Sequence, residues 1–447
     1  MAGTEAAYFM TDRRINTIFE VDNNYNEEQR EAEAPQDDIE STLKPWICVL
    51  GAFTFVIPSF GFMQSVGTLQ SYLQLNQLSE YSTGDIGWIT GMYMFLSYFF
   101  TLQIGPICDH YGPMVIGSLG VAITIASFLI LAECNTYWQL MLCLGVLGSM
   151  GGATIATVAM SVVAKLFSRR RGLAMGITVT GSSVGSILFP ILLRSTFTDL
   201  GWRWAMRILA LVIAGIIVPG LFCFIPFQRL VKGLPHTMPQ SHAKAAINFA
   251  AFRSYPFTFV TGGSFLLEFA IFSIAGLLPI IATNTGFSPE DGYTLLSILG
   301  VGSCVGRILP GICGDLVGPF NTILIMTAIT LLFMTTLFIP FASKSESVLY
   351  AFSALWGFGS GSFLSVSPVC VGLTCQAKDY GRFYGTWTFS MSFSVLIAIP
   401  VSGLLLDHMG TQALAALLTA IVFLGGICYV AARAFMVGKL LSPKIKM

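Results

Sequence analysis

Long apolar stretches, each able to cross a lipid bilayer as one helix, dominate this sequence and limit what it can fold into. A helix needs about 20 mainly apolar residues to span the hydrocarbon core. We expect six spans before a polar stretch at 228–251 and six after it, near 46–68, 86–107, 114–132, 138–165, 172–193, 204–226, 255–282, 292–313, 320–341, 347–375, 383–404 and 411–436. The sequence therefore predicts an all-α membrane protein with twelve transmembrane helices arranged six plus six.

The amino-acid composition agrees with a chain that is solvated mainly by lipid. Hydrophobic residues make up 54% and charged residues 10% of the 447 residues, whereas a globular domain in water carries about 25% charged residues. We expect a monomer that binds no nucleic acid. The expected parts are a cytoplasmic tail (1–45), an N-terminal bundle (46–227), a cytoplasmic linker (228–252), a C-terminal bundle (253–438) and a second cytoplasmic tail (439–447).

The N-terminal tail is strongly acidic. Residues 1–45 contain 11 of the 23 acidic residues of the chain and only four basic residues. The tail has few apolar residues and no periodicity. Burial of so little apolar surface cannot offset the conformational entropy lost on ordering, so we expect disorder. The tail lacks the pattern of a cleavable signal peptide, and the first membrane helix is expected to direct insertion.

Basic residues predict which side of the membrane the termini face, because Lys and Arg are retained on the cytoplasmic side. With the N-terminus inside, cytoplasmic segments hold 18 Lys and Arg residues, outer loops and adjoining helix ends hold four, and Arg307 remains inside a span. Both termini should therefore be cytoplasmic. We expect a multi-pass protein of the plasma membrane, with a vacuolar or other internal membrane as the alternative.

We expect no cofactor, metal site or enzymatic activity. Most of the ten cysteines lie inside apolar runs, and no Cys/His cluster has the spacing of metal ligands. The G-x-x-x-x-G-K-[ST] string of phosphate-binding loops does not occur, which argues against an ATP-driven pump. The glycine-rich string at 300–306 misses dinucleotide-binding spacing, so we interpret it as helix packing.

One nine-residue pattern occurs twice, between the second and third expected helices of each half. Residues 105–113 read GPICDHYGP and residues 311–319 read GICGDLVGP, both G-x-x-x-D-x-x-G-P and 206 residues apart. Gly105 and Gly311 permit a tight turn or close helix approach, and Asp109 and Asp315 can accept hydrogen bonds from a neighbouring helix N-terminus. We interpret the strings as a repeated gate in two pseudo-symmetric bundles, with ordinary loop chemistry as the alternative.

These paired strings resemble the loop signature of the major facilitator superfamily, in which two six-helix halves rock around a site at the membrane midplane. The basic residue that follows the Asp in that family is replaced here by His110 and Leu316, and its later basic residue by Met114 and Phe320. The resemblance implies a secondary transporter in which the charged part of the gate is altered.

A second stretch, FSRRRGLAMGITVTGSSVGSILFP at 167–190, is similar to the helix 4 to helix 5 segment of the monocarboxylate porter family, and most to its fungal members. Arg171 and the two arginines before it would lie at the cytoplasmic interface, where they can meet headgroups or the Asp109 region. Glycines recur behind them and give a closely packing helix face. Further similarity is carried by GFMQSVGTLQSYL, GWRWAMRIL, GRILPGICGD and PVSGLLLDHMG.

Two charged residues lie deep within expected spans, where a charge costs at least about 2.5 kcal/mol and therefore suggests a function. Glu268 lies roughly 20 Å along its helix, near the midplane, and Arg307 lies one to two turns from the cytoplasmic end of the next helix. Their long side chains could pair with each other or approach a shared cavity.

Arg307 stands where the porter resemblance places a helix 8 arginine that holds a substrate carboxylate, a task that suits the two parallel hydrogen bonds of a guanidinium. A structural ion pair is the alternative. The aspartate and lysine that couple protons to lactate in animal members correspond to Ser303 and Gln64. We therefore assign Arg307, Gln64 and Ser303 to substrate binding and do not expect simple lactate–proton symport.

Glu268 is the candidate for proton coupling, because desolvation near the midplane favours the protonated carboxyl group and would let it take up and release a proton during the cycle. A Glu268 that only bridges helices is the alternative. Weaker candidates are cavity-lining aromatic residues and helix hinges, namely Phe60, Tyr93, Trp356 and Trp387, and Pro58, Gly357, Gly359 and Gly361.

The sequence thus predicts a monocarboxylate-porter-like secondary transporter of a small organic solute, which moves an organic acid or exports a secondary metabolite. Proton coupling, facilitated uptake of a nutrient such as a monocarboxylate or vitamin, and a non-transporting solute sensor on the same fold stay open as alternatives.

Overall fold

The computed structural model describes residues 42–167, 170–227, 230, 249–341, 346–375 and 380–437, and within these ranges every regular element is helical. Nine helical segments there are long and apolar enough to cross a membrane. Two of them, α8 (Arg171–Phe222) and α15 (Tyr380–Val437), each turn back at an internal glycine and so cross twice. The nine segments therefore account for eleven passes, and α4 (Thr83–Tyr111) adds the twelfth in the described chain. This confirms the predicted fold class.

The helices before and after the central linker form the two halves. The first half comprises α2 (Leu43–Val56), the π-helical η1 (Ile57–Gly61), α3 (Phe62–Leu75), α4, α5 (Pro113–Leu131), α6 (Tyr137–Leu140), the π-helical η2 (Met141–Gly148), α7 (Ser149–Leu166) and α8. The second comprises η3 (Phe249–Arg253), α10 (Tyr255–Asn284), α11 (Pro289–Val317), α12 (Pro319–Phe333), the π-helical η4 (Met334–Phe338), α13 (Ile339–Phe341), α14 (Glu346–Leu373) and α15.

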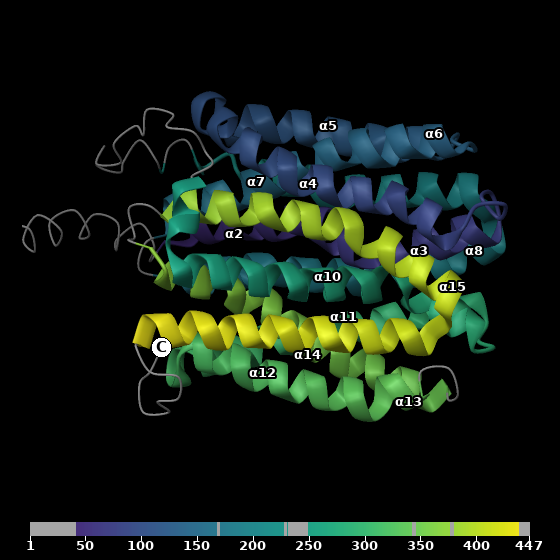
Figure 1. The fold of residues 1–447 in the computed structure, drawn as a ribbon. Coiled ribbons are helices and arrows are strands. Elements are labelled where there is room, and N and C mark those ends of the chain that lie inside the picture. The colour runs from purple at the N-terminus through teal and green to yellow at the C-terminus, as the bar shows by residue number, and fades with distance from the viewer. Residues whose placement is uncertain are drawn as a thin grey trace, which may run out of the picture.

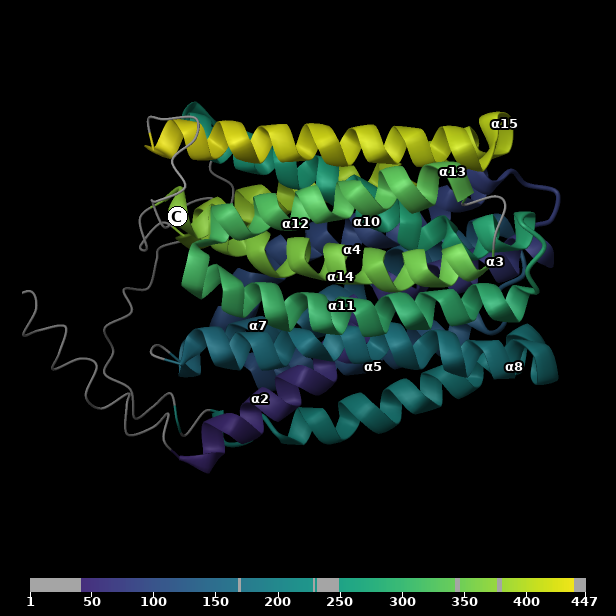
Figure 2. The same cartoon turned by 90° about the horizontal axis from the view of Figure 1, so that it is seen from below.

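The long helices run roughly side by side, and the start of α2 and the end of α15 lie at the same end of the bundle (Figures 1 and 2). We call this the terminal end and the opposite end the distal end. An even number of passes requires this placement of the two described chain ends. The expected acidic tail up to residue 41, almost all of the linker and the C-terminal tail lie outside the described residues, so the expected domain boundaries stay predictions.

Four glycines with positive φ form the tightest turns between passes. Gly112, Gly201, Gly318 and Gly410 have φ values of 83°, 71°, 101° and 80°, with ψ between 143° and 180° in magnitude. Only glycine readily adopts this backbone region. The four turns end the second, fifth, eighth and eleventh passes, so the structure repeats a three-helix unit four times where the sequence pattern indicated two repeats.

We expect Gly410→Ala to destabilise the protein by about 1–3 kcal/mol, because an L side chain at this φ is strained. The measurement is the thermal unfolding temperature of the purified protein in detergent. Gly215→Ala is the matched control, since Gly215 lies within α8 and nothing lies within 4 Å of an added Cβ. Equal unfolding temperatures for the two variants would contradict the role of Gly410.

The halves meet mainly at three helix pairs, α3 with α10, α4 with α15, and α8 with α11, and α3 also contacts α11. Small residues let the backbones approach at each pair. A Cβ added to Gly87 of α4 would lie 2.9 Å from Pro400 N of α15, and one added to Gly300 of α11 would lie 3.1 Å from the Ser186 carbonyl carbon of α8. Such close packing replaces the hydrophobic effect as the main attraction between helices in a membrane.

Candidate functional site

Glu268 connects the two halves near the middle of α10. Its side chain is 6% exposed, and the Tyr98 hydroxyl of α4 lies close enough to interact with its carboxylate. Among the described residues, the Glu268 Oε2 atom has no hydrogen-bond partner. Tyr98 is half-buried. The carboxyl group therefore lies beside Tyr98 of the opposite half and keeps one oxygen free to accept a proton or a donor group.

Arg307 of α11 also bonds to the opposite half. Its side chain is 7% exposed, and its Nη1 atom donates to the Val179 carbonyl oxygen at 3.0 Å and to the Ser182 hydroxyl, both on α8. The Nε atom of Arg307 has no partner in the part of the chain that the structure describes. The guanidinium thus keeps donor capacity beyond its contacts with α8.

Glu268 and Arg307 do not form an ion pair with each other. The ion pairs recorded within the described ranges join Arg194 to Asp291, and Arg203 and Arg207 to Glu133, and every side chain in them is at least 38% exposed. Tyr98 instead interacts electrostatically with both Glu268 and Arg307. The two buried charges therefore both lie near Tyr98, and their approach to a shared cavity stays a prediction.

Ser303 and Gln64 are buried but have different surroundings. Ser303 lies one turn before Arg307, is 1% exposed, and its hydroxyl has no partner among the described residues. Its backbone packs against Gly357 and Gly361 of α14, where an added Cβ would collide. We therefore interpret these two glycines as packing positions. Gln64 is 7% exposed and follows directly after η1 on α3. Their assignment to the substrate site stays a prediction.

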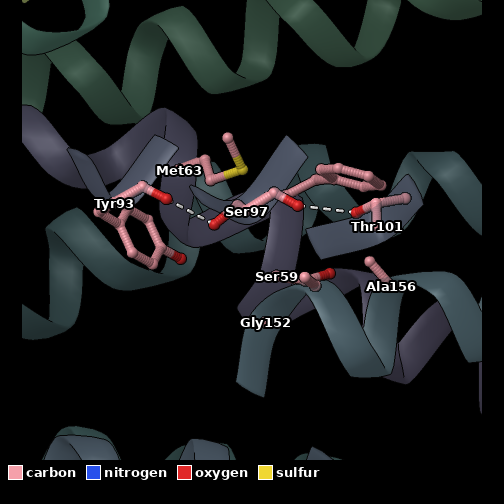
Figure 3. A pocket seen from close by; sticks show the side chains of 9 residues that line it. Ser59, Met63, Tyr93, Ser97, Thr101, Gly152 and Ala156 are labelled. Atoms are coloured by element: carbon pink, nitrogen blue, oxygen red, sulfur yellow. Dashed lines mark hydrogen bonds between the residues drawn. The ribbon is translucent and has the colours of Figure 1, made fainter. Parts of the chain in front are cut away.

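A small hollow lies in the first half between η1, α3, α4 and α7, and Figure 3 shows its lining. It has no free space for even one water molecule, whereas small-molecule pockets enclose ~300–1,000 Å³. Ser97 and Thr101 donate to the backbone one turn earlier, at 2.7 and 2.8 Å (Figure 3), so these hydroxyls can only accept further bonds. Phe60 and Tyr93, both candidates from the sequence, line this closely packed hollow.

The predicted hinge at Pro58 coincides with the π-helical segment η1, which supplies Ser59 and Phe60 to the hollow. A π-helical turn widens the helix and often occurs at functional sites. The other two aromatic candidates, Trp356 and Trp387, are buried in the second half, and neither indole N–H has a partner among the described residues.

The repeated loop strings end α4 and α11, as expected. Among the described residues, nothing lies within 4 Å of a Cβ added to Gly105 or Gly311, and the turns are made by Gly112 and Gly318 instead. The side chains of Asp109, Asp315 and Arg171 lie outside what the structure describes. Their role in a gate stays a prediction.

One contact between the halves was missed in the sequence. Asp407 near the end of the eleventh pass accepts hydrogen bonds from the Thr83 amide at 2.8 Å and the Thr83 hydroxyl at 2.6 Å. The signal was present, because GLLLDHMG at 403–410 repeats G-x-x-x-D-x-x-G without the final proline. Tyr98 and Ser182 carried no comparable signal, since polar residues are common in all the spans.

Comparisons with known proteins agree with this arrangement. The family described as Major Facilitator Superfamily matches residues 47–329 and 260–443. The chain is 30% identical over 439 residues to an MFS-type transporter, hasB, of Aspergillus fumigatus, which covers 94% of this chain and 96% of that protein. It is 30% identical to the riboflavin transporter MCH5 of Saccharomyces cerevisiae (89% and 80% covered) and to the aspyridones efflux protein apdF of Emericella nidulans (82% and 73%).

Proposed function

Because this chain belongs to the Major Facilitator Superfamily, we propose that it is a secondary transporter that carries a small organic solute across a membrane by alternating access. Its relatives are transporters, not enzymes. In such folds two helix bundles rock around a site near the bilayer midplane. We further propose that it belongs to the monocarboxylate porter family, lies in the plasma membrane and has both termini in the cytoplasm, as the arginine-rich segment and the distribution of basic residues suggest.

One observation carries the proposal. The two charged residues buried deep in the second half both interact with the first half, Glu268 with Tyr98 and Arg307 with α8. A solute or proton that competes for these groups would change the free energy of the contact between the two halves. A ligand can shift a conformational equilibrium only through such differential contacts. We propose that Arg307 holds an acidic or acceptor group of the solute and that Glu268 carries the coupled proton.

We propose export of a secondary metabolite as the direction and solute class. Gln64 and Ser303 stand where the resemblance places the residues that couple protons to lactate, which favours a solute larger or less charged than lactate. The relative from Emericella nidulans is described as an efflux protein for aspyridones. The second candidate is uptake of a vitamin-like nutrient, which the similarity to a yeast riboflavin transporter favours.

Solute flux in reconstituted vesicles with an imposed pH gradient tests this function. The panel should include aromatic polyketide-type acids, flavins and monocarboxylates. Saturable flux of at least one solute, with accumulation that follows the gradient, is the expected result. Saturable binding with no flux would contradict transport and indicate a sensor. Flux that does not depend on the pH gradient would contradict proton coupling.

We propose that the Tyr98 hydroxyl donates to the Glu268 carboxylate, and we expect Tyr98→Phe to lower proton-driven accumulation about tenfold. A hydrogen bond to a charged group contributes about 1.5–3 kcal/mol, and the ring itself is retained. The measurement is the initial flux as a function of pH. Loss of the donor should move the pH of half-maximal flux, which a packing defect would leave in place. Tyr255→Phe on α10, where the side chain is 67% exposed, is the control. Identical pH profiles for Tyr98→Phe and wild type would refute the role of Tyr98.

A further inference from the structure

At the distal end of the molecule, the two halves share a contact that neither the sequence pattern nor the similarity to other transporters had assigned. Thr83 is the first residue of α4, and the first four amides of a helix have no partner inside it. The Ser82 hydroxyl caps the Asp85 amide, whereas the Thr83 amide donates to Asp407 of α15. The start of a first-half helix is thus capped by a carboxylate of the second half.

Two side chains of α3 extend this contact. Gln74 Nε2 donates to the Thr83 hydroxyl at 2.6 Å, and that hydroxyl donates to Asp407 at 2.6 Å. Gln70 accepts from the Thr90 hydroxyl at 2.8 Å one turn deeper. Asp407 therefore ends a chain of hydrogen bonds that begins on the first pass, so α3, α4 and α15 are held together at one place.

Two further contacts join the halves at the distal end. Beside Asp407, a Cβ added to Gly403 would lie 3.0 Å from the Gly84 amide nitrogen. Across the molecule, Arg194 of α8 donates to Thr294 of α11 at 2.8 Å.

We propose that Asp407 is a gating residue of the transport cycle, which closes the distal end of the solute pathway by capping α4 and releases it when the halves separate there. The proposal rests on the proposed function, because a gate needs a pathway. A charge-assisted bond to a helix N-terminus is strong enough to bias the closed state. Asp407 is also solvent-exposed, so water can replace its partners on opening, and the contact can form and break reversibly.

Hydrogen–deuterium exchange of the full-length protein in nanodiscs tests the gate at a place that Asp407 does not touch. The segment 284–295 carries the second contact between the halves, through Thr294 and through Glu290, which accepts from Thr198 at 3.3 Å. If Asp407 holds the distal end shut, Asp407→Ala should speed exchange there about tenfold, and Asp407→Asn, which keeps one acceptor oxygen, should give a smaller increase.

Asp85→Asn is the matched control. It removes a carboxylate from the same turn of α4, but its side-chain partner Ser82 lies beside it in the first half. This variant should leave exchange in 284–295 unchanged. Faster exchange confined to residues near Thr83 in the Asp407 variants would make Asp407 only a helix cap and overturn the proposal, as would no change at all.

The two proposals fail in different ways, because the exchange experiment needs no solute. Absence of flux in vesicles, together with an exchange response in the Asp407 variants, would reject transport and leave the contact as a conformational element of a sensor. Flux with unchanged exchange at 284–295 would reject the gate and leave the transporter.

Discussion

Arg307→Ala should lower solute transport by at least about 30-fold. The variant removes a buried guanidinium that bonds to the Val179 carbonyl and the Ser182 hydroxyl and that we assign to the solute. Truncation of one member of a buried, charged hydrogen-bonding pair costs about 2–5 kcal/mol, and each ~1.4 kcal/mol is a factor of ten. The measurement is initial flux over a range of solute concentrations, so that KM and the maximal rate separate.

Ser182→Ala is the control that separates solute binding from contact between the halves. It removes the hydroxyl that Arg307 meets on α8 and leaves the guanidinium in place. If Arg307 binds the solute, Arg307→Ala should raise KM far more than Ser182→Ala does. Arg307→Lys should lie between them, because an ammonium keeps the charge but loses the planar fork. Equal defects in the alanine variants would assign Arg307 to the contact alone.

Glu268→Gln should abolish accumulation driven by a pH gradient while solute exchange continues. Gln keeps the size of the side chain and can still accept from Tyr98, but it cannot take up and release a proton. With one coupled proton, a gradient of one pH unit can drive about tenfold accumulation. We expect the variant to reach equal solute concentrations on both sides, measured as the steady-state ratio in vesicles.

Glu133→Gln provides the comparison for Glu268. Glu133 is a carboxylate of the same chain that is half-exposed and pairs with Arg203 and Arg207, so its loss should not alter the accumulation ratio. Unchanged accumulation in Glu268→Gln would show that Glu268 only bridges helices. Loss of exchange as well as accumulation would indicate a damaged site instead of a lost proton carrier.

Much of the architecture could be predicted from the sequence, because a transmembrane span is a local property. Each of the twelve passes is an apolar run long enough for the bilayer, and its neighbours hardly affect whether it forms a helix. The expected first span at 46–68, for example, lies within the continuous helical stretch Leu43–Leu75. Glu268 and Arg307 were also identifiable, since a charge inside an apolar run stands out wherever the run packs.

The fourfold recurrence of turn glycines was harder to predict. The turn glycines Gly112, Gly318 and Gly410 each end an Asp–x–x–Gly pattern, whereas Gly201 ends Asp–x–Gly. Only Gly112 and Gly318 are followed by a proline. A positive φ leaves no unique mark in a chain with 45 glycines. The backbone angles, and not the residue type, show that the four turns are equivalent.

The sequence by itself determined that the chain lies in a membrane, how many times it crosses, where its two halves divide and which two charges are buried. Each of these depends on residue type over a short window. Only the tertiary structure decided what those charges touch. Arg307 and Val179 are 128 positions apart, and Thr83 and Asp407 are 324 apart. Such contacts depend on how two preformed bundles dock, which is set by small residues along α3, α4, α8 and their partners, and no local pattern specifies that docking.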